Sequence, residues 1–164
     1  MPTSPVWCID TSSIITLRSQ FSRDDHRKIL EGLSKLVAAG RLRFPREVVA
    51  ELERYEGAEN PALRWAQAHQ GTATQLQPSF EDVAAVLAEV PEVIDADKEG
   101  VEEADVYVLA LAHRLTLNDE DARVVTEEFK TTVAKMPLGS AAGYLRIPSV
   151  SIRAMLKFEG IMEF

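Results

Sequence analysis

Several kinds of residue and segment are scarce in this sequence of 164 residues, and each absence argues against a class of protein. The single cysteine, Cys8, allows no internal disulfide, so we expect a reducing compartment. The longest uninterrupted apolar run, from Val106 to Ala112, is far shorter than the roughly 18–20 residues that cross a bilayer, so we expect no membrane span. No basic segment followed by a long apolar stretch opens the sequence, so we expect no secretion signal and a cytoplasmic protein.

Motifs of several common enzyme classes are absent as well. The histidines at positions 26, 69 and 113 show no paired spacing, which gives no support to a zinc site or a histidine base. Apolar residues make up 46% and charged residues 27% of the chain, as in ordinary globular proteins. The length and composition together predict one packed domain over residues 1–164.

Charge of one sign is concentrated in the middle of the chain. The formal net charge is −8, and it divides into +2 for residues 1–54, −13 for residues 55–128 and +3 for residues 129–164. A nucleic acid could therefore still meet a basic wall formed by the two ends. Tight non-specific binding to phosphates is not expected, and the acidic middle favours a protein partner that carries a basic segment.

Short strands alternate with helices along the sequence. The patterns predict strands at 6–9, 42–44, 123–126 and near 145–147, and helices at 22–40, 46–55, 61–69, 79–90, 102–115 and 151–159, with a helix also following the capping residues 10–13. The part around 56–100 is expected to be a helical segment. This alternation predicts an α/β fold, a three-layer α/β/α sandwich with a short-stranded, mainly parallel sheet.

Acidic residues follow two of the predicted strands. Asp10 comes directly after the first strand, and Glu127 and Glu128 follow the strand that ends at Thr126. Ligands of open parallel sheets bind beyond the carboxyl ends of the strands, so these acids are candidates for a site. The structural alternative is that Asp10 caps a helix and that the two glutamates favour a helix N-terminus.

Asp105 lies on the apolar face of its predicted helix, which it shares with Val108, Leu109 and Ala112. A carboxylate is rarely buried without a partner, so this placement indicates a function, although a cap in the first helical turn is the alternative.

Glu51 borders another apolar stripe, and a surface ion pair with Arg46 or Arg54 is its structural alternative. Acids gathered at one end of a sheet would repel one another unless a cation neutralised them, and oxygen-only ligands select Mg²⁺ or Mn²⁺.

Four segments, residues 9–12, 45–52, 104–112 and 124–128, resemble the ordered motifs of the PIN-domain nucleases, a family that includes the VapC-type ribonuclease toxins. The resemblance implies a parallel sheet flanked by helices and a Mg²⁺- or Mn²⁺-dependent endonuclease that acts mainly on RNA. Since residues 56–100 form a longer segment than in compact toxins, the chain is closer to the larger PIN-like proteins.

The resemblance also implies roles for individual residues. Asp10, Glu51 and Asp105 match the first three acids of the family. Glu128 stands where most members carry aspartate and Glu127 where they carry asparagine, so either glutamate can complete the site. We expect Asp10 and Asp105 to bind the metal and Glu51 to complete the site or orient water. The hydroxyl residues Thr11, Ser12 and Thr126 are expected to bond the carboxylates or the scissile phosphate.

Two hypotheses about function follow from these residues. The first is a metal-dependent endoribonuclease, the toxin of a toxin–antitoxin pair, which cleaves RNA with one or two bound ions, forms a dimer and is restrained by the helix of an antitoxin protein. The second is a catalytically weak PIN-like scaffold that binds protein or nucleic acid. Metal binding followed by thermal melting distinguishes them most simply.

Overall fold

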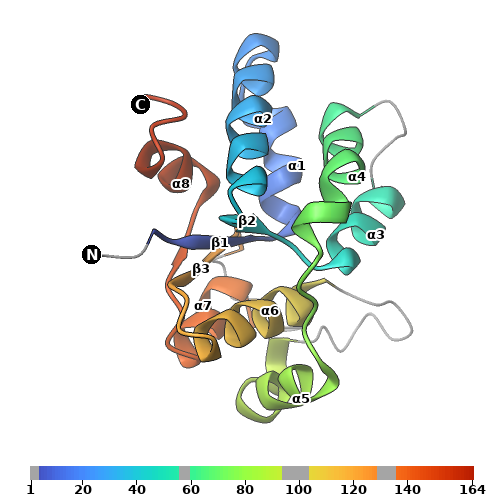
Figure 1. Cartoon of the computed structure of the whole chain (residues 1–164), viewed down its shortest axis with the longest axis vertical. Coiled ribbons are helices and arrows are strands. Elements are labelled where there is room, and N and C mark those ends of the chain that lie inside the picture. Colours follow the sequence, from blue (N-terminus) through green and yellow to red (C-terminus); the bar gives the residue numbers. More distant parts are fainter. Residues whose placement is uncertain (1–3, 56–59, 94–103, 129–135) are drawn as a thin grey trace.

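Four short parallel strands form the centre of the structure, a computed structural model that describes residues 4–55, 60–93, 104–128 and 136–164 (Figure 1). The strands lie in the order β2-β1-β3-β4. Their bounds are Val6–Ile9 for β1, Leu42–Arg43 for β2, Ala122–Val125 for β3 and Ser149–Val150 for β4. All of their pairings are parallel, as the alternation of strands and helices predicts.

Helices cover both faces of this sheet, which confirms the three-layer α/β/α sandwich (Figure 1). One layer contains α1 (Thr11–Gln20), α2 (Arg23–Ala38), α3 (Arg46–Tyr55), α4 (Pro61–Ala73) and α8 (Ile152–Phe158). The opposite layer contains α5 (Phe80–Glu89), α6 (Asp105–Leu117) and α7 (Leu138–Tyr144), and a short 3₁₀ turn, Pro91–Val93, follows α5. No helix in the described ranges combines the length and the apolar character needed to cross a membrane.

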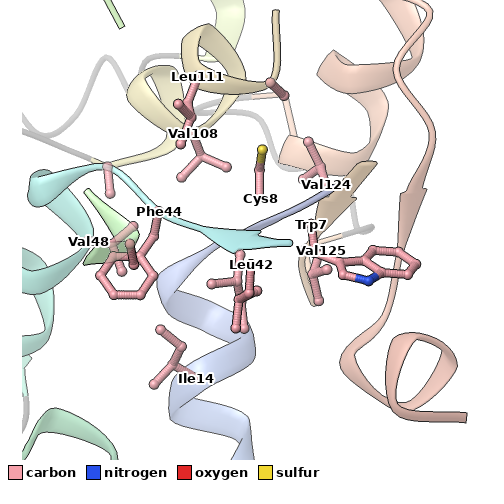
Figure 2. Packing of buried hydrophobic residues seen from close by; sticks show 14 of the residues in the cluster. Trp7, Cys8, Ile14, Leu42, Phe44, Val48, Val108, Leu111, Val124 and Val125 are labelled. Atoms are coloured by element: carbon pink, nitrogen blue, oxygen red, sulfur yellow. The ribbon is translucent and has the colours of Figure 1, made fainter. Parts of the chain in front are cut away.

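The hydrophobic core lies on both faces of the sheet because β1 is apolar and buried at every position and β3 is so at all positions except Arg123. Cys8 points toward α6, on the same side as Val108 and Leu111, whereas Leu42 and Val125 point to the opposite face, toward Ile14 of α1 (Figure 2). Successive side chains of a strand alternate between the two faces, so a strand covered on both sides reads as a continuous apolar run. The core thereby fixes the carboxyl ends of β1 and β3 side by side.

Capping residues set the ends of several helices where the sequence predicts them. Ser22 caps α2 and Ser79 caps α5, the latter in a reciprocal capping box with Asp82. Ser151 accepts a hydrogen bond from the backbone N–H of Ala154 at the start of α8. Gly40, with φ of 73°, follows the end of α2 in the left-handed region that glycine adopts without strain.

The strand predicted near 145–147 is wrong. These residues close the end of α7, since the carbonyl of Ala142 accepts hydrogen bonds from the N–H of Leu145 at 3.0 Å and from the N–H of Ile147 at 2.9 Å. Arg146 between them has φ of 60°, which no extended strand contains. The backbone donors of Leu145 and Ile147 are therefore used by the helix terminus, and β4 starts only at Ser149, two residues after the end of the predicted strand.

Helix α7 was not predicted from the sequence, whereas the boundaries of the predicted helices differ from the observed ones by a few residues. Helix α4 continues to Ala73, past the predicted end at residue 69, and includes Gly71, which no side chain crowds. Residues 102 and 103, where the next helix was expected to start, lie outside the described residues, as do 56–59 and 94–100 of the expected helical middle.

Candidate metal centre

Asp10 occupies the junction between β1 and α1, and both roles that the sequence suggests for it are present. Its Oδ1 accepts a hydrogen bond from the N–H of Thr11 at 2.8 Å, which caps α1. Its Oδ2 accepts one from the Ser12 hydroxyl at 2.8 Å and one from the Thr126 hydroxyl at 3.1 Å. With a relative exposure of only 1%, the carboxylate is fixed in one orientation by three donors.

The carboxyl end of β3 supplies the groups that orient these hydroxyls. The N–H of Asp10 donates to the carbonyl of Val125 at 2.9 Å, which sets Thr126 beside Asp10. The N–H of Glu127 donates to Ser12 Oγ at 3.0 Å, and that of Glu128 donates to Thr126 Oγ1 at 3.0 Å. The hydroxyls of Ser12 and Thr126 each accept one of these backbone hydrogen bonds through a lone pair. Each therefore has its single proton available to donate to Asp10.

Asp105 and Glu128 join Asp10 at this edge of the sheet. Asp105 is the first residue of α6 and is buried, as its place on the apolar face of the helix predicts. One carboxylate oxygen from each of the three residues lies within 4.8 Å of the other two. We call Asp10, Asp105 and Glu128 the carboxylate cluster. Its members come from three segments of the chain that only the folded sheet brings together.

The electrostatics of the carboxylate cluster disfavour three unneutralised charges. Burial raises the pKa of Asp10 well above its ordinary value of 3.8, and the neighbouring carboxylates of Asp105, Glu128 and Glu51 raise this pKa further. The hydrogen bond from Ser12 acts in the opposite direction but is outweighed. Apposed buried carboxylates are stabilised either by a proton or by a cation.

The donor set fits a divalent cation of the hard type. Its ligand atoms are carboxylate oxygens, which suit Mg²⁺, Mn²⁺ and Ca²⁺. Oxygens bound to Mg²⁺ at about 2.1 Å lie at most about 4.2 Å apart, so a separation within 4.8 Å requires only small side-chain movements. The carboxylate cluster could therefore hold a divalent metal ion.

Glu51 supports the carboxylate cluster from α3. Its Oε2 accepts a hydrogen bond from the N–H of Ala104, the residue before Asp105, at 2.9 Å. The same oxygen lies 3.9 Å from the guanidinium of Arg54, so the ion pair expected as the structural alternative is also present. Glu51 is not one of the three clustered residues, yet it is near enough to raise the pKa of Asp10. It thus fixes the start of α6 and adds negative charge to the site.

Glu127 and Glu128, which the sequence leaves interchangeable, have different surroundings in the structure. Glu128 belongs to the carboxylate cluster, whereas Oε1 of Glu127 accepts hydrogen bonds from the N–H of Ile152 at 2.7 Å and from the hydroxyl of Ser13 at 3.3 Å. The structure therefore does not place Glu127, one of the predicted metal ligands, in the cluster.

The three hydroxyl residues predicted for the site also differ in their contacts. Ser12 and Thr126 bond the Asp10 carboxylate as expected, while Thr11 contributes its backbone N–H. The Thr11 hydroxyl is buried and makes no hydrogen bond within the described residues. Sequence reasoning assigned no role at the site to Ser13 or Ile152. Ser13 was recognised only as one of the capping residues 10–13, and Ile152 only as part of the last helix.

A family described as "Domain of unknown function (DUF4411)" matches residues 7–162, and the chain belongs to this family. The matched span runs from within β1 through α8 and includes every member of the carboxylate cluster. Searches of curated proteins and of solved structures gave no match.

Proposed function

We propose that this protein is a metal-dependent endoribonuclease of the PIN-like kind, which uses Mg²⁺ or Mn²⁺ held by Asp10, Asp105 and Glu128. The observation that supports it is the carboxylate cluster, three acids from separate segments whose oxygens lie within 4.8 Å of one another. The order of the four sequence motifs that carry these acids and Glu51 resembles the order in PIN-domain nucleases. The choice of RNA rests on that resemblance.

The residues of the chain divide the proposed chemistry between them. A divalent cation, when bound, would act as a Lewis acid that neutralises charge on a phosphodiester and activates water. Asp10 is held in one orientation by three hydrogen bonds, so it presents its remaining lone pairs without reorganisation. Asp105 is fixed by α6, whose first turn Glu51 holds through Ala104. No nucleophilic side chain of the protein is required.

The resemblance extends the proposal to partners. A VapC-type toxin would be restrained by an antitoxin protein and would act as a dimer in the cytoplasm. The net charge of −8 favours an antitoxin segment that is basic. A PIN-like scaffold that binds metal without cleaving RNA is the alternative, and the following experiment distinguishes it.

Cleavage of single-stranded RNA tests the proposal. We expect cleavage with Mn²⁺ or Mg²⁺ and none with excess chelator. Asp105→Asn keeps the shape of the side chain but removes one charged ligand, so the cleavage rate should fall by at least about a hundredfold, the effect of losing one preorganised electrostatic group. The matched control is Glu89→Gln, which removes one negative charge from an exposed position of α5.

Two outcomes would decide against the proposed activity. Equal cleavage by the wild-type protein and by Asp105→Asn would show that the activity does not come from the carboxylate cluster. Saturable Mn²⁺ binding without cleavage of any RNA would support the scaffold instead.

A further inference from the structure

We propose that Glu127 is a positioning residue of the metal centre and that, through it, cation affinity depends on the docking of α8, a helix that contributes no ligand. This inference rests on the proposed function for the existence of the metal site. It goes beyond that function because it assigns a role to a residue and a helix that lie outside the carboxylate cluster.

The side chain of Glu127 joins three segments of the chain. Its Oε1 accepts a hydrogen bond from Ser13, which is fully buried in α1, and one from the N–H of Ile152, the first residue of α8. The backbone of Glu127 follows β3 directly. One carboxylate oxygen therefore ties β3, α1 and α8 together beside the carboxylate cluster. Its negative charge also suits the N-terminal end of α8.

The backbone of Glu127 transmits this anchoring to Asp10. Its N–H donates to Ser12 Oγ at 3.0 Å, and Ser12 Oγ donates to Asp10 Oδ2 at 2.8 Å. If residue 127 moved, Ser12 would lose the donor that fixes the direction of its hydroxyl proton. Glu128, the adjacent residue, would lose its position in the carboxylate cluster at the same time. Groups that orient metal ligands typically change metal affinity 10–100-fold when they are removed.

The C-terminal end of α8 is anchored by contacts that do not involve Glu127. These contacts help to fix the position of the whole helix, including the N–H of Ile152 at its start. Glu159, the C-cap of α8, accepts hydrogen bonds from Trp7 Nε1 at 2.8 Å and from Arg41 Nη1 at 3.1 Å. Ile161 packs against Gly32 of α2, where a Cβ would come within 2.8 Å of its side chain. Helix α8 is thus held at both ends, and Glu127 is its link to the metal centre.

Mn²⁺ affinity of the folded protein, measured by isothermal titration, tests this role. Glu127→Ala should weaken Mn²⁺ binding about 10–100-fold. Glu127→Gln should restore most of the affinity, because its amide oxygen can still accept both hydrogen bonds. Ser22→Ala is the control, since it removes the cap of α2 and lowers stability without touching the site. Ser13→Ala, which removes one contact of Glu127, should show an intermediate loss and serves if Glu127→Ala does not fold.

The outcomes separate this inference from the proposed function. If the wild-type protein does not bind Mn²⁺, both fail. If it binds Mn²⁺ and Glu127→Ala or Ser13→Ala weakens binding no more than Ser22→Ala does, the positioning role alone is overturned. Equal loss in Glu127→Gln and Glu127→Ala would show that the charge itself is needed, as for a ligand, and would also overturn it. Glu128→Gln should weaken binding in every case in which the metal site exists.

Discussion

Individual residues in this protein serve stability and the proposed site at once, and the two demands conflict most clearly at Asp105. Its carboxylate is buried beside those of Asp10 and Glu128. Like charges a few ångströms apart in a partly buried site interact by several kcal/mol at most, depending on the effective dielectric constant. The folded protein without a cation therefore carries repulsion that the unfolded chain does not.

Replacing Asp105 by asparagine should make the metal-free protein more stable, because one repelling charge is removed while the shape is kept. We expect the melting temperature in excess chelator to rise by about 2–4 °C for each kcal/mol of repulsion relieved. With saturating Mn²⁺ the order should reverse, since the variant lacks a ligand. A lower melting temperature of Asp105→Asn in chelator would contradict a repulsive cluster.

The sequence predicted those members of the site that can be recognised from their immediate neighbours in the chain. Asp10 directly follows an apolar strand, and Asp105 interrupts a helical apolar face, so each could be recognised from its neighbours alone. The choice between Glu127 and Glu128 could not be predicted, because it depends on the N–H of Ile152, 25 positions further along the chain. The support that Glu51 gives to Ala104 likewise exists only once α3 and α6 are packed in the fold.

At the scale of elements, the sequence predicted the helices and strands that have strong local signals and misplaced those that have weak ones. The serine caps and apolar periodicities placed α2, α5 and α8 within a residue or two. The segment 145–147 reads as a strand from its apolar side chains, yet its backbone donors close α7. The two residues of β4 are too few to show a period, so only the pairing with β3 defines this strand.

Helices α5 and α6 are joined by an ion pair between Asp82, whose carboxylate is buried, and Arg114, whose guanidinium is partly exposed. Asp82 accepts hydrogen bonds from Ser79 in the capping box and from the guanidinium of Arg114, with Nη2 at 2.7 Å. Burial raises the pKa of Asp82, but the hydrogen bonds from Arg114 and Ser79 outweigh it and hold this pKa below its ordinary value of 3.8. A depressed carboxylate pKa stabilises the fold above the unfolded-state pKa, and this stabilisation is lost as the pH falls through the folded-state pKa.

Asp82→Asn should therefore lower the free energy of unfolding by about 1 kcal/mol at neutral pH, the scale of a hydrogen-bonded cap and of a pair whose arginine is open to solvent. The difference should shrink between neutral pH and an acidic pH below the depressed pKa of Asp82, where the wild-type carboxylate is protonated as well. Urea unfolding at the two pH values measures it, with Glu81→Gln at an exposed neighbouring position as control. A difference that stays constant with pH would show that packing, and not charge, holds the two helices together.

At the scale of the whole molecule, the order of the strands assembles the site. Because β1 and β3 are neighbours, the segments around residues 10 and 128 meet although more than a hundred positions separate them. Helix α6 packs against both strands and brings Asp105 to the same edge. The net charge of −8 adds a general negative field, which favours cation uptake and disfavours loose binding of nucleic acid.

The stability of the whole fold should accordingly depend on pH in opposite ways with and without a cation. Burial and the neighbouring carboxylates raise the pKa of Asp10 above 3.8. Between that ordinary value and the raised value, the folded protein binds more protons at Asp10 than the unfolded chain does. The contribution of Asp10 to stability therefore falls as the pH rises through this window. A cation competes with the same proton, so its affinity rises with pH over the same window.

Thermal melting of the wild-type protein and of Asp10→Asn, each at a series of pH values above 3.8, measures both effects. In excess chelator, the stability of the wild type relative to Asp10→Asn should decrease with rising pH, because only the wild type loses a stabilising proton from this position. With Mn²⁺ at 100 times its dissociation constant the wild type should gain about 2.7 kcal/mol, and at a fixed Mn²⁺ concentration the gain should grow with pH. Asp10→Asn should gain far less, because it lacks a charged ligand. The opposite result, a metal-free wild type that gains stability relative to Asp10→Asn as the pH rises, would contradict this prediction. It would show that the three hydrogen bonds to Asp10 keep its carboxylate ionised, and that the neighbouring carboxylates do not govern its charge.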